Sequence, residues 1–515
     1  MAPHAGEAPW WRRAVIYQIY PRSFADGNGD GVGDLKGLCD RLDHLSWLGV
    51  DALWLSPFYR SPMRDFGYDV SDYCDVDPVF GTLADFDALV AAAHARDLRV
   101  VVDWVPGHTS SDHAWFVEAR SSRSSPKRDW YVWRDPRPDG KPPNNWVSAF
   151  TSGGPAWTFD EHTGQWWLHS FLPEQPDLNW ENPEVQEAML AVVRFWLDRG
   201  VDGFRVDVVH NIGKDPALAD AEEKYAALPH CVLNDDPRTH GHLRRIRRVL
   251  DSYSGDRMMV GEVFLLTTEQ IRPYYGDGDE LHLSFNFPPM FAPWSAEKWR
   301  ACIEEASALL DPIEAWPTWV LSNHDQPRHR TRYGGEARAR AAAVLLLTLR
   351  GTPFLYMGEE LGLENAVIPA ERVVDPGGRD GCRAPLPWIR EAGHGWPSDP
   401  WLPFPPDAAE RSVEASIADP GSMLHLYRRI LHARRASRAL RDGALELLSS
   451  PRGLLAYRRV AAEDARVILV NTAEASASIE LPSALVVDVA SDGVGEGGRF
   501  EGIVAASRAL ILRPV

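Results

Sequence analysis

Short apolar runs alternate with longer amphipathic segments over most of the chain. The runs are rich in β-branched and aromatic residues and have the length of buried strands; they cover 14–20, 52–57, 98–105, 203–209 and 258–264. The segment 183–199 carries apolar residues at helical spacing and leads directly into the run at 203–209. A helix that feeds a buried strand, in a chain that repeats this alternation, predicts parallel β/α units.

Three further strand candidates end near Phe287, Asp325 and Gly358, with helical runs between them. Counted from Tyr17, the candidates number eight. Eight strands alternating with helices predict an α/β fold of the (β/α)8 TIM-barrel type.

Two segments depart from this alternation. From 108 to 176, Pro, Gly, Ser and Trp dominate, and a segment of that length is too long for an ordinary loop. It predicts an inserted subdomain after the third strand. Beyond a helix near 423–438, short strands separated by turns predict a small antiparallel β domain. We therefore expect a first barrel part at 1–107, the inserted subdomain at 108–176, a second barrel part at 177–438 and the C-terminal β domain at 439–515.

Polar side chains stand at the ends of four predicted strands. His108 follows the third strand, and the run 203–210 (Gly-Phe-Arg-Val-Asp-Val-Val-His) places Arg205 and Asp207 on one face of a strand. Glu262 and Asp325 end two later strands. Taken alone, the pair Arg205 and Asp207 would indicate a buried salt bridge that only stabilises packing. Four strand ends carrying polar groups favour a functional site, because TIM barrels carry their active sites at the carboxyl ends of the strands.

Oxygen-bearing side chains recur at alternate positions in 26–34, which reads Asp-Gly-Asn-Gly-Asp-Gly-Val-Gly-Asp. Interleaved with glycines, this spacing suits a loop that wraps a hard cation, like the first half of an EF-hand loop. An acidic, solvated turn is the alternative, and the spacing favours the metal. Since the loop precedes every candidate catalytic motif, we expect the ion to be structural.

The four strand ends resemble the α-amylase family of glycoside hydrolases. The segment 175–179, Gln-Pro-Asp-Leu-Asn, is similar to the oligo-1,6-glucosidase and α-glucosidase branch of that family. The resemblance runs from Tyr17 to about Pro387 and keeps several motifs in the family's order. It implies the barrel, an inserted subdomain after the third strand, and cleavage with retention of configuration.

The resemblance also implies roles for matching residues. Asp65 would bind hydroxyls of the terminal glucose, Tyr68 would stack beneath its ring, and Arg379 would reach the same sugar. Phe150 and Phe171 match aromatic residues that narrow the pocket entrance, with core packing as the alternative for each. The implied calcium ligands are Asp26, Asn28, Asp30, Asp34 and the carbonyl of Val32.

Glycosidic cleavage needs two carboxyl groups in opposite protonation states. Asp207 lies beside Arg205, and a neighbouring cation lowers a carboxyl pKa, so we expect Asp207 to be the nucleophile. Glu262 lies among Val and Phe residues, where desolvation raises the pKa, so we expect the general acid there. Asp325 would bind hydroxyl groups of the distorted sugar ring. The neutral His108 and His324 would donate hydrogen bonds to the same sugar.

These features predict an exo-acting, retaining α-glucosidase on short oligosaccharides. A transglucosylase, or an isomerase or hydrolase of sucrose, trehalose or trehalose-6-phosphate, would use the same carboxylates. A non-enzymatic transporter heavy chain would lack part of the carboxylate set that this chain keeps. In the resembled branch, Val at the position of Val208 accompanies acceptance of α-1,6 links, with simple strand core as the alternative.

Amino-acid composition indicates which classes of binding partner and which cellular location to expect. The formal net charge of −19 argues against nucleic acid and against an anionic membrane. The 21 Trp supply flat faces for sugar rings, although many also fill a large core. Five cysteines without metal-ligand spacing indicate free thiols in a reducing compartment. With no signal peptide and no apolar run of membrane-spanning length, we expect a cytoplasmic location, an oligosaccharide as the partner, and no organic cofactor.

Overall fold

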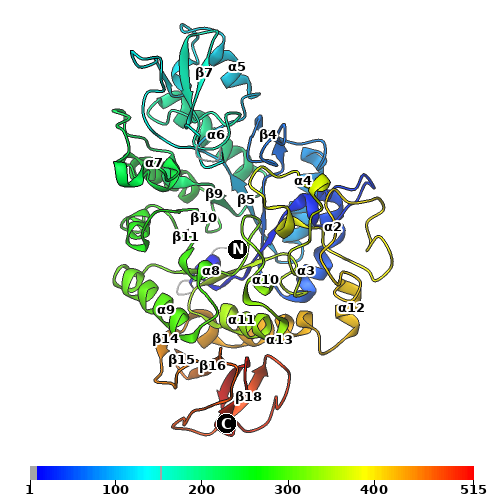
Figure 1. Cartoon of the computed structure of the whole chain (residues 1–515). Coiled ribbons are helices and arrows are strands. Elements are labelled where there is room, and N and C mark those ends of the chain that lie inside the picture. The colour runs from blue at the N-terminus through cyan, green and yellow to red at the C-terminus, as the bar shows by residue number, and fades with distance from the viewer. Residues whose placement is uncertain (1–7, 151–153) are drawn as a thin grey trace.

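The computed structural model describes residues 8–150 and 154–515. Its centre is a parallel sheet of eight strands in the order β11-β10-β9-β5-β2-β1-β13-β12. The strands are β1 (Ile16–Ile19), β2 (Ala52–Leu55), β5 (Arg99–Trp104), β9 (Gly203–Val206), β10 (Met258–Gly261), β11 (Leu283–Ser284), β12 (Thr318–Val320) and β13 (Thr352–Tyr356). The predicted (β/α)8 barrel is confirmed, and Figure 1 shows its helices around the strands.

A side chain joins the two edge strands of this sheet. The hydroxyl of Thr318 on β12 donates to the carbonyl of Ser284 on β11 over 2.8 Å. The same oxygen accepts the amide N–H of Asn286 over 3.1 Å. The hydroxyl thus satisfies main-chain groups where no regular ladder pairs the two strands.

Helices pack around the strands, and α6 (Pro183–Asp198) is an example of one that buries a single apolar face. In α6, the Asn182 side chain accepts the N–H of Glu184, and Pro183 occupies the first turn, where no N–H is needed. Val185, Met189 and Val193 on its inner face are buried. The other helices of this part are α1 (Trp10–Arg13), α2 (Leu35–Asp40), α3 (Leu42–Leu48), α4 (Leu83–His94), α7 (Arg238–Asp251), α8 (Pro288–Phe291), α9 (Ala296–Leu310), α10 (His329–Tyr333), α11 (Glu336–Thr348), α12 (Val413–Ala418), α13 (Met423–Ala436) and α14 (Arg438–Asp442).

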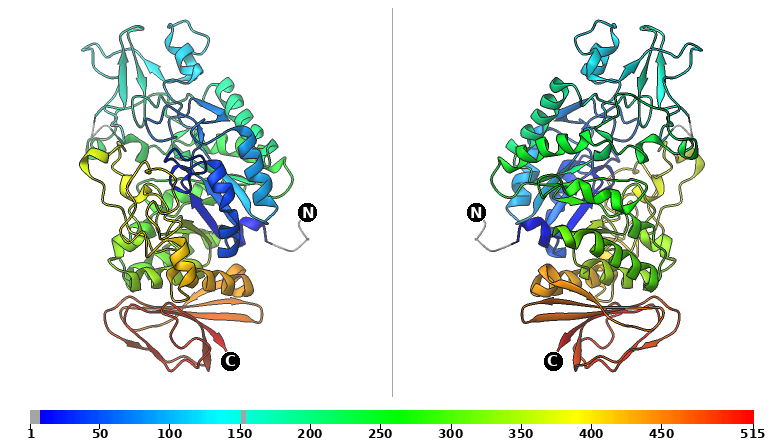
Figure 2. Two further views of the ribbon diagram at one scale, coloured as in Figure 1. Left: turned by 90° about the vertical axis from the view of Figure 1, so that its right-hand side faces the viewer. Right: turned by 90° about the vertical axis from the view of Figure 1, so that its left-hand side faces the viewer.

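The segment after β5 forms a separate lobe at one end of the molecule (Figures 1 and 2). It contains α5 (Ala114–Arg120) and an antiparallel sheet of β6 (Trp133–Arg134), β8 (Gln165–Leu168) and β7 (Trp157–Asp160). The loop that follows β9 packs on this lobe: Leu218 is in its apolar cluster, and the Trp146 indole donates to the Ala219 carbonyl over 2.9 Å. The expected spans 1–107 and 108–176 include residues 1–7 and 151–153, which lie outside the described residues.

An antiparallel sheet occupies the opposite end of the molecule (Figure 2). Its strands are β14 (Ala444–Leu447), β15 (Leu454–Ala461), β16 (Asp464–Asn471), β20 (Ala509–Pro514) and β18 (Leu485–Ala490), beside a ribbon of β17 (Ala477–Ser478) and β19 (Ile503–Val504). A buried arginine joins this sheet to the barrel: Arg459 on β15 donates to the carbonyl of Thr348, at the end of α11, over 2.6 Å. Within the barrel part, Arg434 on α13 donates to the neighbouring carbonyl of Leu347 over 3.0 Å.

Candidate active site

The three candidate carboxylates stand just beyond the carboxyl ends of β9, β10 and β12, at one mouth of the barrel. Strand β9 ends at Val206, three residues before the predicted end at 209. Val208 has φ of 35° in the left-handed region, a strained conformation for a β-branched residue. This turn directs the Val208 N–H to Glu262 Oε2 over 3.3 Å and brings the Val208 side chain to the cavity. The alternative that Val208 is strand core is therefore wrong.

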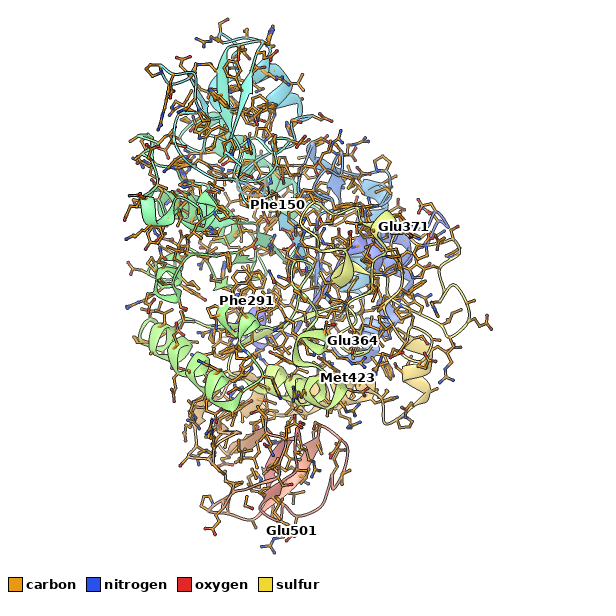
Figure 3. All side chains as sticks on the ribbon, viewed as in Figure 1. Phe150, Phe291, Glu364, Glu371, Met423 and Glu501 are labelled. Carbon is orange, nitrogen blue, oxygen red and sulfur yellow. The ribbon has the colours of Figure 1, made fainter. Side chains whose placement is uncertain are left out.

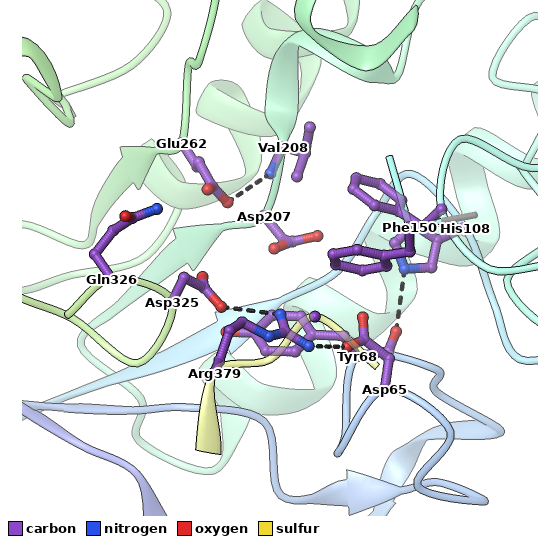
Figure 4. Close-up of a pocket in the computed structure, with 12 residues that line it drawn as sticks. Asp65, Tyr68, His108, Phe150, Asp207, Val208, Glu262, Asp325, Gln326 and Arg379 are labelled. Atoms are coloured by element: carbon purple, nitrogen blue, oxygen red, sulfur yellow. Dashed lines mark hydrogen bonds and ion pairs between the residues drawn. The ribbon is translucent and has the colours of Figure 1, made fainter. Parts of the chain in front are cut away.

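A cavity of about 280 Å³ opens at this mouth. Gln326 and Gly377, which the sequence analysis did not select, line it (Figure 4). The predicted residues that line it are Asp65, Tyr68, His108, Phe150, Phe171, Asp207, Val208, Glu262, Asp325 and Arg379. The structure thus brings together ten of the twelve predicted catalytic and substrate-binding residues. Arg205 and His324, the remaining two, are buried behind the cavity wall.

Arg205 is the cation shared by the carboxylates at this mouth. Its Nη1 lies 2.8 Å from Asp103 Oδ1 and 2.7 Å from Asp207 Oδ1, and its Nη2 is paired with Glu262 Oε2. Burial raises the pKa of Asp207 to about 7, and repulsion from Asp103 adds to this rise, while Arg205 opposes it. The expectation that Arg205 leaves Asp207 with a lowered pKa is therefore wrong, because desolvation outweighs a cation divided among three carboxylates.

Glu262 has the environment of a general acid. Burial raises its pKa to about 8, and the charges of Asp207 and Asp325 add to the effect, while Arg205 and the Val208 N–H oppose it. Burial raises the pKa of both carboxyls, and both contact Arg205, so the two titrate as a coupled pair. Glycosidic cleavage requires the state in which Asp207 is ionised and Glu262 keeps its proton.

Arg379 closes one end of the cavity. Its guanidinium lies 2.6 Å from Asp65 Oδ1 and 3.0 Å from Asp325 Oδ1, and it is anchored by Asp375 at 2.7 Å. Burial alone would raise the pKa of Asp325, but neighbouring positive groups hold it well below its usual range. His324 is neutral at pH 7, because burial lowers its pKa to about 3, so Arg379 and Arg383 supply the positive charge at neutral pH.

The two histidines sit in a hydrogen-bonded shell. His324 Nδ1 lies 2.7 Å from Gln18 Nε2, and its Nε2 lies 2.6 Å from the Tyr68 hydroxyl. His108 Nε2 lies 3.1 Å from Gln175 Nε2, which also donates to an oxygen of Asp65. Burial lowers the pKa of both histidines, so both are neutral at pH 7.

Sequence reasoning missed five residues of this shell: Gln18, Asp103, Gln175, Asp375 and Arg383. Asp103 lies in the predicted strand 98–105 and Gln175 in the motif 175–179. The sequence analysis used these segments to predict a strand and a branch of the family, and it did not assign the two residues to the site. Asp375 and Arg383 flank Arg379: Asp375 pairs with both arginines, and Arg383 also pairs with Asp325. An Asp and an Arg four residues either side of a site arginine are the signal that could have found them.

The loop at 26–34 is held by its own hydrogen bonds. Asp26 accepts the N–H groups of Gly29 and Gly31 over 2.6 and 2.9 Å, and Asp30 accepts that of Val32 over 2.8 Å. Asp34 caps α2 by accepting the N–H of Gly37 over 2.6 Å. The donor set of carboxylates, amide and carbonyl is all oxygen, which suits calcium. Over residues 8–150 and 154–515, however, no three His, Cys, Asp or Glu side chains are placed to hold a metal ion.

Two further properties bear on the setting of the protein. Cys39, Cys74, Cys231, Cys302 and Cys382 are all free. No helix in the described part of the chain has the length and hydropathy needed to cross a membrane.

Known proteins resemble this chain over nearly its whole length. The family described as alpha amylase, catalytic domain, matches residues 18–443. A probable alpha-glucosidase from Rhizobium meliloti (strain 1021) is 45% identical, covering 92% of this chain and 91% of its own. An oligo-1,6-glucosidase from Parageobacillus thermoglucosidasius is 38% identical, covering 93% of each.

Solved structures of similar enzymes support the same family assignment. An alpha-glucosyl transfer enzyme superposes with a TM-score of 0.92 at 42% identity, covering 99% of this chain and 100% of its own. A trehalulose synthase superposes with a TM-score of 0.91 at 33% identity, covering 98% and 100%. With the barrel, the paired carboxylates and these matches together, the chain belongs to the α-amylase family and is a glycoside hydrolase.

Proposed function

We propose that the enzyme is a retaining, exo-acting α-glucosidase that hydrolyses terminal α-1,4 or α-1,6 bonds of short α-glucosides. The observation that carries this proposal is the pair Asp207 and Glu262, which lie on one guanidinium and line one cavity. Asp65, Arg379 and Asp325 are linked across one end of the cavity. A cavity closed at one end by these three linked side chains suits a terminal glucose better than an internal unit of a long polymer.

In the first step, the Asp207 carboxylate attacks the anomeric carbon and the glycosidic C–O bond breaks. The proton of Glu262 passes to the departing oxygen, which leaves as an alcohol, and the glucosyl group stays as an ester on Asp207. In the second step, the Glu262 carboxylate takes a proton from water, the water oxygen attacks the same carbon, and the ester bond breaks. Two inversions give retention. Asp325 and Arg379 would hold the hydroxyls of the ring through both steps.

A transfer reaction is the second candidate, since an α-glucosyl transfer enzyme and a trehalulose synthase have closely similar structures. Both reactions share the first step and differ in what attacks the ester. Product analysis with maltose, isomaltose, sucrose and trehalose separates them: hydrolysis releases free glucose from every molecule cleaved, whereas transfer or isomerisation yields new glucosides.

Two substitutions test the assignment of the carboxylates. Asp207→Ala and Glu262→Gln should each lower kcat on an aryl α-glucoside by several orders of magnitude, because each removes a group that acts on the reacting atoms. Circular dichroism should show an unchanged fold. The matched controls are Asp72→Ala and Glu118→Gln, two exposed carboxylates away from the cavity. Near-normal activity in either folded site variant would refute the assignment.

We also propose calcium as a structural ion of the loop at 26–34. The all-oxygen donor set and the alternate spacing of Asp26, Asn28 and Asp30 support it. The ion would bind the native loop and so stabilise the folded state by linkage.

A further inference from the structure

A second cavity lies at the opposite end of the barrel from the catalytic carboxylates. It measures about 350 Å³, within the range of about 300–1,000 Å³ that is typical of small-molecule sites. Val15, Asp51 and Arg99 line it, and they stand at the amino ends of β1, β2 and β5, three neighbours in the sheet. None of the described residues lines both this space and the catalytic cavity. It is therefore a separate site, which we call the amino-end cavity.

Helices α1, α13 and α14 form the outer wall of the amino-end cavity. Trp10 on α1, Leu431 on α13 and Arg441 on α14 line it. Figure 3 labels Met423, the first residue of α13, and Phe150, which lines the catalytic cavity. The Trp10 ring gives the wall a flat apolar face.

Positive charge dominates this cavity. Five of its described lining residues are arginines, namely Arg13, Arg99, Arg434, Arg435 and Arg441. The acidic residues of the described lining are Asp51 and Asp97. The chain as a whole has a formal net charge of −19, so an excess of guanidinium groups in one cavity is contrary to its average composition. Such an excess attracts anions.

Two of these arginines are already paired with carboxylates. Arg435 Nη2 lies 2.9 Å from Asp51 Oδ1, and Arg99 Nη1 lies 2.9 Å from Asp202 Oδ1. Each pair compensates the charge of its arginine and fixes the side chain in the wall. Arg434 and Arg441 differ, because within the described part of the chain no carboxylate forms an ion pair with either of them.

Arg434 is a buried cation in this wall. It is 2% exposed, its Nη groups donate to three main-chain carbonyls at 2.9 to 3.0 Å, and its Nε is buried without a partner among the described residues. Burial lowers the pKa of Arg434 to about 10, and repulsion from Arg441 adds to this effect, while Asp51 and Asp442 oppose it. The group therefore stays charged at pH 7. Carbonyl oxygens satisfy its N–H groups without neutralising it, and an anion in the cavity would compensate its charge.

Arg441 carries a guanidinium that the described residues leave unpaired. Its Nε is buried without a partner, and its side chain forms no hydrogen bond or ion pair with residues 8–150 and 154–515. A guanidinium presents its N–H donors in a planar fork that matches two oxygens of a phosphate. Arg441 therefore offers a free fork close to the buried charge of Arg434.

We propose that the amino-end cavity binds the phosphate group of a small phosphorylated molecule, with Arg441 as the contact to its oxygens. A phosphate monoester carries about 1.5 to 2 negative charges at pH 7 and three acceptor oxygens, so it matches this group of arginines better than a carboxylate does. An apolar cavity of about 150 Å³ holds benzene, so this larger cavity has room for the organic part of an ester beside Trp10. Inorganic phosphate, sugar phosphates and nucleoside monophosphates share the group, and the experiment separates them.

Binding is measured by isothermal titration calorimetry and by the melting temperature, with inorganic phosphate, glucose 6-phosphate and AMP as probes. Every titration contains excess glucose, which keeps the sugar of a probe out of the catalytic cavity, and sodium chloride holds the ionic strength constant. We expect at least one probe to bind and to raise the melting temperature as its concentration increases. The probe that binds most tightly identifies the source of the phosphate group. Neither readout depends on turnover, so failure of the proposed hydrolysis leaves this test unaffected. No binding of any probe at millimolar concentration would overturn the proposal.

Two charge changes of opposite effect locate the binding. Arg441→Gln should weaken it about ten-fold or more, because a charged hydrogen-bond donor is lost. Asp97→Asn should tighten it roughly three-fold, because a negative charge leaves the lining, and Asn tolerates the φ of 58° at this position. Asp97→Asn also keeps the test open should Arg441→Gln not fold by circular dichroism.

Arg438→Gln is the matched control for these variants. Arg438 lies on α14 with Arg441, is exposed and is outside the described lining, so its loss should leave the affinity unchanged. Parental affinity in a folded Arg441→Gln variant, affinity that does not rise in Asp97→Asn, or an equal loss in Arg438→Gln would each overturn the proposal.

Discussion

Replacing Arg205 with Met should displace the pH profile of the enzyme. Arg205 is 2% exposed and is the cation that contacts Asp103, Asp207 and Glu262. Its removal leaves their ionised forms uncompensated, so the pKa values of these carboxyls rise. Asp207 must be ionised and Glu262 protonated for the first step. Both limbs of the pH–rate profile should therefore move to higher pH.

The size of the displacement follows from the contacts. A unit charge about 4 Å away at an effective dielectric constant of 20 contributes about 4 kcal/mol, or about 3 pKa units. Three carboxylates share this cation, and their mutual repulsion decreases as each takes up a proton. We therefore expect a displacement of about 2 units for Asp207. From a starting pKa of about 7, this lowers the ionised fraction at pH 7 roughly fifty-fold.

The assay measures kcat/KM on an aryl α-glucoside from pH 4 to pH 10, with a melting curve at each pH to confirm folding. The Arg205→Met variant should lose less activity at pH 9 than at pH 7. Asp103→Asn is the companion variant: the Asp103 charge raises the pKa of Asp207, so its removal should move the acidic limb to lower pH. Equal losses at every pH in Arg205→Met, or displacements of the same sign in both variants, would refute the electrostatic reasoning.

Three other outcomes are expected. Excess chelator, and separately Asp30→Ala, should lower the melting temperature; an unchanged curve together with no metal by elemental analysis would exclude the calcium site. Val208→Thr should shift the kcat/KM ratio toward maltose over isomaltose by roughly ten-fold, and an unchanged ratio would contradict a role for this side chain in linkage choice. Arg379→Lys should lower kcat/KM about a hundred-fold, because an ammonium cannot reproduce the fork that spans Asp65 and Asp325; activity within about two-fold of the parent would contradict this.

The sequence by itself determined the elements and the chemistry at their ends. Apolar runs separated by helical periodicity are local signals, and they gave the eight strands and the helix at 183–198 within a few residues. Asp207 and Glu262 could be found because they directly follow β9 and β10, and Asp325 because it lies in the segment just after β12. Parallel strands align their carboxyl ends, so residues far apart in the chain had to meet at one mouth.

Tertiary structure decided the electrostatics and the shape of the site. The sequence places Arg205 two residues from Asp207, but not Asp103 and Glu262 on the same guanidinium, and this sharing reverses the expected direction of the Asp207 pKa. The catalytic cavity likewise combines Asp65, Phe171 and Arg379 from three loops. Desolvation and shared charge depend on every neighbour in space, and contacts between distant loops leave no periodic trace in the chain, so these properties arise only when the barrel closes.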